Sequence, residues 1–99
     1  MLLPHALTLA QARTYVASLA DGACSIEASS AYEHVLMQLD RLHGDDCPAL
    51  YYESLCEGRA TLLVLASAAI EEFEQYGIDP LSVELVLAML GDAYAKDGT

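Results

Sequence analysis

Basic residues are scarce in this chain. Its 99 residues include four Lys and Arg against fifteen Asp and Glu, which gives a formal net charge of −11. Binding to nucleic-acid phosphates needs a Lys/Arg patch, and so does attraction to an anionic membrane surface. The composition therefore argues against both. An acidic surface of this kind serves solubility, or it attracts a basic protein partner.

The start of the chain shows no signal-peptide pattern, and no long hydrophobic run occurs in the sequence. The first five residues carry no Lys or Arg and already include Pro4, unlike a secretory signal. The most apolar stretch, 62–70, is far too short to cross a bilayer and is followed by two glutamates. The three cysteines, an odd number, are Cys24, Cys47 and Cys56. We therefore expect a reduced, cytoplasmic protein with no membrane span.

Apolar residues are plentiful, at 55% of the chain, and in the first half they recur at helical spacing. The pair Thr8 and Gln11 matches a capping box and predicts a first helix from Thr8 to Asp21. Gly22 suits the left-handed position that ends a helix. A second helix is predicted from about Ser25 to His43, although Ser25, Ser29 and Ser30 all compete as its N-cap.

The second half predicts two more helices. One opens at 45–48 with two acids and a proline and runs to Tyr76, with Gly58 as a kink or break. The last has Asp79 as its N-cap and Pro80 as its first residue. We expect one all-α domain over 1–99, frayed at 1–7 and 96–99. Its architecture should be an antiparallel bundle of four helices, or five if Gly58 breaks the third.

Metal and catalytic motifs are weak. His43, Cys47 and Cys56 could converge at the turn after the second helix, but a structural zinc site needs a fourth ligand. That ligand would have to be Cys24 or His5, both remote in sequence. No Glu is followed by His three residues later, as a di-iron bundle would require. We therefore predict no metal, no cofactor and no enzymatic activity.

The acids near the end of the third predicted helix are the most informative polar cluster. Glu71, Glu72 and Glu74 oppose the helix dipole there, and Asp79 follows at the next cap. Either solvent tolerates them, or one of the arginines (Arg13, Arg41 or Arg59) folds back to neutralise them, or they form a docking patch. With Tyr76, whose ring suits interfaces, these four acids are our candidate partner-binding residues.

Three functional hypotheses follow. The first is a non-enzymatic interaction module that binds, and can inhibit, a basic or nucleic-acid-handling protein. Antitoxin-like and immunity-like inhibitors offer an analogy based on charge and size alone. The second is a homo-oligomeric structural or regulatory protein, most simply a homodimer. The third is a small metal- or ligand-binding bundle with a cavity lined by His43 or a cysteine.

Overall fold

The computed structural model describes residues 3–43 and 58–97 as helices joined by short turns. The helices are α1 (Leu3–Asp21), α2 (Ile26–His43), α3 (Arg59–Glu71) and α4 (Pro80–Asp97), and a 3-10 turn, η2 (Glu72–Tyr76), continues α3. No strand occurs within these residues. The predicted all-α bundle of four helices is confirmed.

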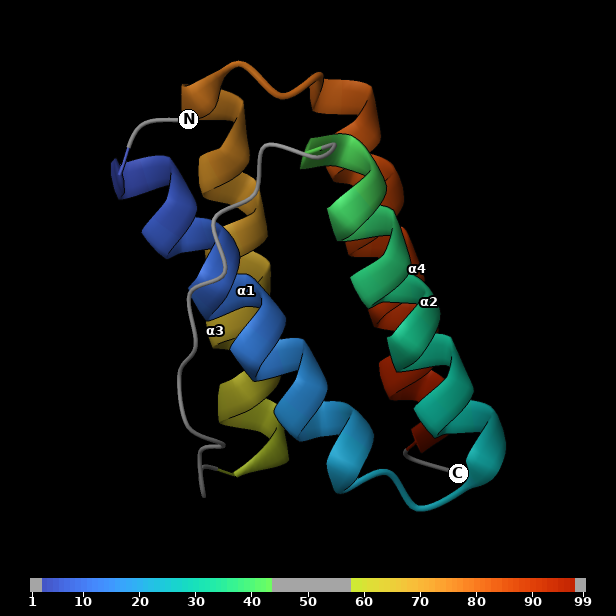
Figure 1. The fold of residues 1–99 in the computed structure, drawn as a ribbon. Coiled ribbons are helices and arrows are strands. Elements are labelled where there is room, and N and C mark those ends of the chain that lie inside the picture. The colour runs from blue at the N-terminus through green and yellow to red at the C-terminus, as the bar shows by residue number, and fades with distance from the viewer. Residues whose placement is uncertain (1–2, 44–57, 98–99) are drawn as a thin grey trace.

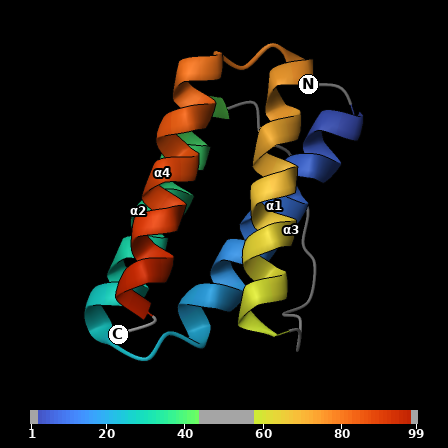
Figure 2. The same cartoon turned by 180° about the vertical axis from the view of Figure 1, so that it is seen from behind.

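Helices that lie side by side run in opposite directions. α1 packs mainly against α3 and α2, α2 packs against α4, and α3 makes a smaller contact with α4. Figures 1 and 2 show that α2 and α3, although consecutive, run in the same direction on opposite sides of the bundle. Our expectation that every helix would be antiparallel to the next therefore fails at this one connection. Because residues 44–58 separate the two helices, no short loop forces them to be antiparallel.

The core is built from the apolar stripes that the sequence predicted. The largest fully buried side chains come from all four helices and η2: Val16, Leu19, Tyr32, Val35, Leu39, Ile70, Phe73, Val83, Val86 and Leu90. Small alanines, among them Ala12, Ala66 and Ala93, are also fully buried and allow the helices to approach closely. Burial of such side chains is the main source of stability in a domain of this size.

The described helices extend further toward both ends of the chain than the sequence predicted. α1 begins at Leu3 rather than Thr8, because Pro4 is tolerated in a first helical turn and His5 is buried. Thr8 lies inside the helix, where its Oγ1 donates a hydrogen bond to the carbonyl of Pro4. Residues 3–7, for which we predicted fraying, thus form the first turns of α1. α4 likewise extends to Asp97, whose side chain is only 4% exposed.

Local signals mark the other helix boundaries. Ser25 is the N-cap of α2, since its Oγ accepts a hydrogen bond from the backbone N–H of Ala28 at 3.1 Å. Gly58 has an extended backbone and precedes α3, so the described helix begins after it. α4 begins at Pro80, as predicted. A helix start at 45–48, and any fifth helix before Gly58, lies outside the described residues.

The turn between η2 and α4 depends on a left-handed glycine. Gly77 has φ of 92°, and it is the only described residue with positive φ. The N–H of Ile78 donates to the carbonyl of Phe73, and the N–H of Gly77 donates to that of Glu74. This pattern is a Schellman motif, which caps the exposed carbonyls of a helix end. Gly22 does not adopt the left-handed conformation that we predicted for it.

Candidate functional site

The four predicted acids lie at one end of the bundle. Glu71 is the last residue of α3, Glu72 and Glu74 lie in η2, and Asp79 directly precedes α4. All four side chains are exposed. We call this set of four residues the acidic end. The turn at Gly77 thus brings acids from two successive helical elements to one connection.

The acidic end has no cationic partner in the described part of the chain. Arg13 pairs with Asp40 and Arg59 with Asp97, so neither arginine folds back to neutralise it. Arg41, exposed in the last turn of α2, forms no ion pair with any acid of residues 3–43 and 58–97. The carbonyl end of α3 adds the negative pole of a helix dipole. The resulting potential therefore favours a positively charged ligand.

Tyr76, the fifth candidate residue, is partly buried against α1. Its ring stacks on the imidazole of His5, with ring centroids 4.7 Å apart and planes 8° from parallel. Thr8, one turn further along α1, shares its single hydroxyl hydrogen between the carbonyl of Pro4 and Glu72 Oε2, which lies 3.3 Å from its Oγ1. Both contacts fix η2 to the first turns of α1. Tyr76 therefore positions the acidic end as well as bordering it.

A buried histidine pair lies beneath Tyr76. The Nε2 atoms of His5 and His43 are 2.9 Å apart, and each residue is 9% exposed. The His43 ring also meets Phe73 edge-on, with centroids 4.7 Å apart. Burial lowers the pKa of His43, and burial together with the charge of His43 lowers the pKa of His5. The two imidazoles are therefore predominantly neutral at pH 7.

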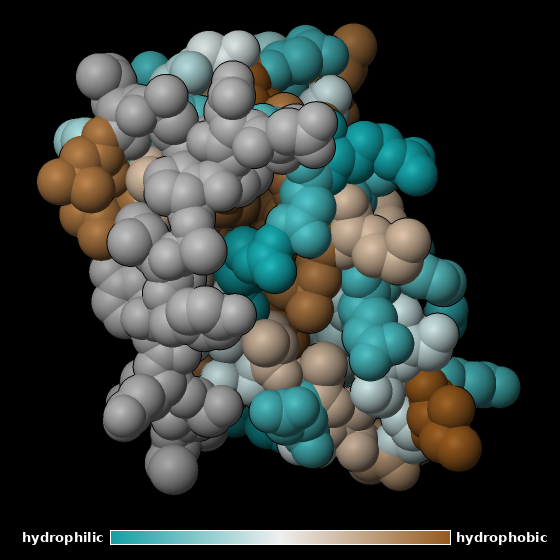
Figure 3. All heavy atoms as spheres, viewed as in Figure 1, coloured by the Kyte–Doolittle hydropathy of each residue, from teal (hydrophilic) through white to brown (hydrophobic). Residues whose placement is uncertain are grey.

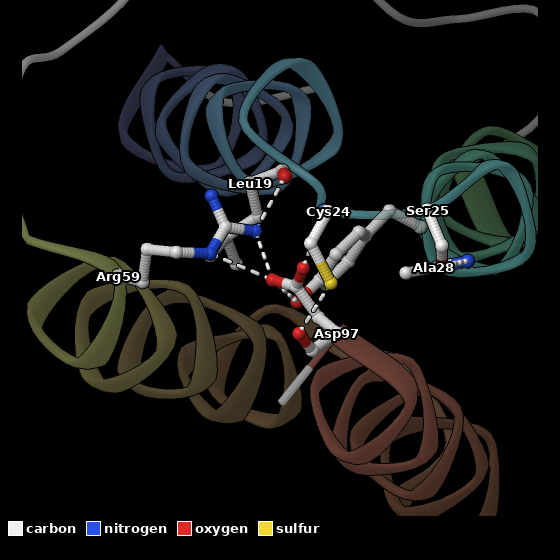
Figure 4. A network of polar contacts seen from close by, with 7 residues as sticks. Leu19, Cys24, Ser25, Ala28, Arg59 and Asp97 are labelled. Carbon is white, nitrogen blue, oxygen red and sulfur yellow. Dashed lines mark hydrogen bonds and ion pairs between the residues drawn. The ribbon is translucent and has the colours of Figure 1, made fainter. Parts of the chain in front are cut away.

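The opposite end of the bundle contains a charged network that sequence analysis did not find (Figure 4). Asp97 Oδ2 accepts hydrogen bonds from Arg59 Nε at 2.6 Å and from the Tyr32 hydroxyl at 3.1 Å. Its Oδ1 accepts from the backbone N–H of Cys24 at 2.9 Å, and Arg59 Nη2 donates to the carbonyl of Leu19 at 2.7 Å. We call this set the Arg59–Asp97 network. It joins the starts of α2 and α3 to the ends of α1 and α4.

The network sets the protonation states of its members. Burial raises the pKa of Asp97, but hydrogen bonds from Cys24, Arg59 and Tyr32 outweigh burial and lower it. Burial and the contact with Asp97 raise the pKa of Tyr32 to about 12. The negative charge of Asp97 is therefore paired within the fold. In the sequence, only the isolated position of Arg59 after Gly58 indicated a structural role for this residue. Nothing in the sequence indicated such a role for Asp97.

The described residues carry no arrangement typical of metal binding or nucleophilic catalysis. No three His, Cys, Asp or Glu side chains of 3–43 and 58–97 are placed to share a metal ion. The Cys24 thiol is exposed and donates to the carbonyl of Asp97, and the neighbouring Asp97 carboxylate is bound by Arg59 and Tyr32. His34 is exposed on α2. Cys47 and Cys56 lie outside the described residues.

Comparisons with known proteins leave the site to be interpreted from its own chemistry. No protein-family model matches the chain, and no match was found among curated proteins or solved structures. None of the described helices is both long enough and apolar enough to cross a membrane.

Proposed function

We propose that this protein is a non-enzymatic interaction module of the cytoplasm whose acidic end binds a basic protein. Binding there can inhibit a partner that handles nucleic acid, because the carboxylates compete for the cationic groove that would hold phosphates. One observation carries this proposal. Four exposed carboxylates surround the carbonyl end of α3, and no described cation neutralises them.

The unfavourable placement of Glu71, Glu72 and Glu74 supports a role in binding. Each exposed carboxylate at a helix C-terminus costs about 0.3–1 kcal/mol relative to a neutral residue, because it adds to the negative pole of the dipole. A cationic partner would convert this cost into attraction. It would also associate faster at low salt, since the field of the whole acidic surface steers a positive ligand toward the protein.

Charge reversal tests the proposal. We expect Glu71→Lys, Glu72→Lys and Glu74→Lys together to leave the helical content unchanged and to abolish capture of a basic protein from host lysate. A control with Glu33→Lys, Asp92→Lys and Glu27→Lys changes the net charge equally on exposed positions of α2 and α4. Equal capture by both triple variants would show that general acidity, and not the acidic end, attracts the partner.

With the partner identified, the salt dependence of its association rate sharpens the test. We expect the rate for the wild-type protein to fall by at least about tenfold as salt rises from low to physiological concentration, as for electrostatically steered association. The triple reversal should remove most of that dependence. An association rate that does not change with salt concentration would contradict the proposal even if binding were tight.

Self-association through α4 is the alternative that a specific observation favours. Leu81 and Leu85 lie one turn apart on this helix and are 72% and 52% exposed. Among the described residues, the other large exposed apolar side chains lie on the remaining helices, with the first two again one turn apart on α1: Leu3, Leu7, Ile26, Met37 and Val64. On the face shown in Figure 3 the exposed brown side chains likewise form separate groups. We therefore expect any homodimer to be weak, and sedimentation of Leu81→Ser with Leu85→Ser against the wild type would test it.

A further inference from the structure

The histidine pair connects elements that are far apart in the sequence. His5 lies in the first turn of α1, and His43 is the last residue of α2. Phe73 and Tyr76 of η2 contact the pair, with His5 stacked on Tyr76 and His43 edge-on to Phe73. The bond between the two Nε2 atoms is thus the polar contact at the centre of an aromatic cluster that holds three elements together.

The hydrogen bonds determine which nitrogen carries each proton. The carbonyl of Leu39 can only accept, and it lies 2.7 Å from His43 Nδ1, so this nitrogen is the protonated one. In a neutral His43 the Nε2 atom then offers a lone pair. His5 must therefore donate its Nε2–H to His43 Nε2 across 2.9 Å. His43 thus adopts the Nδ1–H form and His5 the Nε2–H form.

This arrangement accepts one additional proton but not two. A single imidazolium can still donate to its neutral neighbour, although burial disfavours the charge. When both rings are protonated, both Nε2 atoms carry hydrogen and both rings are positive. Two N–H groups cannot face each other at 2.9 Å, so the bond breaks and the rings must separate.

Within residues 3–43 and 58–97, no carboxylate forms a hydrogen bond with the pair to stabilise its cationic form. Titratable groups on the surrounding elements are the amino terminus, Asp40 and Arg41 on α2, Glu71 on α3, Glu72, Glu74 and Tyr76 on η2, and Asp79 before α4. Asp40 pairs with Arg13, and Glu72 accepts from Thr8. These described acids therefore balance charge on the pair only at a distance.

We propose that the histidine pair is a proton-operated latch, closed while its imidazoles share one hydrogen bond and opened when both are protonated. Opening releases the first turns of α1 from α2 and η2. Because Tyr76 stacks on His5 and Glu72 bonds to Thr8, it also disturbs the acidic end. If the proposed function is correct, mild acid then weakens binding of the basic partner.

Nitrogen-detected NMR of the free, full-length protein tests the latch without any partner. The chain contains three histidines, and the exposed His34 is an internal control. Between pH 8 and 4.5, in buffer containing EDTA, we expect His5 and His43 to titrate below the ordinary histidine range, with mutually dependent curves. At high pH, His43 should show the Nδ1–H form and His5 the Nε2–H form.

Variants connect the titration to the opening. His43→Gln keeps the His5 ring that stacks on Tyr76 and offers an amide oxygen to the His5 Nε2–H, but it leaves only one ring that can be protonated. His34→Gln is the matched control. Contacts between α1 and η2, followed through the Tyr76 ring signals, should be lost in acid by the wild type and His34→Gln but retained by His43→Gln. Independent titration of all three histidines, or an Nε2–H form of His43, would overturn the latch. A latch that titrates as described, with no effect of pH on partner binding, would instead contradict its coupling to the acidic end, whereas failure of the triple charge reversal to reduce binding would contradict the proposed function.

Discussion

The two ends of the bundle are joined by different chemistry. At one end a charged pair, Arg59 and Asp97, links the ends of all four helices, with Tyr32 and Cys24 as further donors. At the other end two neutral imidazoles share a single hydrogen bond within an aromatic cluster. Both solutions join segments that are distant in sequence. The comparison shows two ways to hold helix ends together. One depends on Asp97 being charged, and the other depends on the imidazoles of His5 and His43 being neutral.

This difference predicts opposite protonation requirements. The pKa of Asp97 is lower in the folded protein than in the unfolded chain, so its contribution to stability is lost as pH falls below about 4. The pKa values of His5 and His43 are also lowered, but here the proton adds the charge. Their contribution is present above about pH 6.5 and falls as the pH drops below that value. Acid should therefore loosen the histidine end first and the Arg59–Asp97 end second.

The largest expected effect comes from removing the carboxylate of the network. Asp97→Ala should lower the free energy of unfolding by about 2–3 kcal/mol, because Arg59, Tyr32 and Cys24 N–H all lose their acceptor. The estimate is below that for a fully buried pair, since the Arg59 side chain is 34% exposed and water can solvate it. Urea denaturation at pH 7 measures the change. Asp92→Ala, at an exposed position of the same helix, should change stability little; an equal loss would show that the network is not the cause.

An intermediate effect should appear in the pH dependence of stability. We expect the melting temperature of the wild type to fall by several degrees between pH 7 and 5, since the unfolded chain binds protons that the buried imidazoles resist. A second fall should follow below pH 4. His5→Gln should reduce the first step and Asp97→Asn the second. If His34→Gln reduced the first step equally, the comparison between the two ends would fail.

The smallest expected effects come from two glycines. A Cβ on Gly22 would lie 2.5 Å from Nη1 of Arg59, so Gly22→Ala must displace a guanidinium that the network holds in place. We expect a loss of about 1 kcal/mol, at the low end for overpacking, because the displaced group is a side-chain end. Gly91, in the middle of α4, has open space around it. Gly91→Ala should therefore stabilise the protein by about 0.5–1 kcal/mol. Thermal denaturation measures the stability of both variants. If Gly22→Ala and Gly91→Ala changed stability in the same direction, the packing argument would be contradicted.

The sequence by itself determined the helical class, the core stripes and most helix boundaries. These features rest on interactions within a few residues: the Ser25 cap, Pro80 in a first turn, and apolar side chains at helical spacing. It also located the acidic end, because Glu71, Glu72, Glu74 and Asp79 are close in the chain. The local rules misled us at Thr8, where the helix had already begun at Leu3, and at Gly22, which does not adopt the left-handed conformation.

Only the tertiary structure decided which distant residues meet. In the sequence His5 and His43 drew notice only as weak candidate ligands remote from each other, and Asp97 lay in a segment that we expected to fray. Each nevertheless forms a central contact at one end of the bundle. The direction of α3 was equally undetermined, because the length of the connection before it leaves both orientations open. Local patterns specify how a segment folds. The pairing of remote polar groups depends instead on how the helices pack together, and the periodicity of the sequence does not predict that packing.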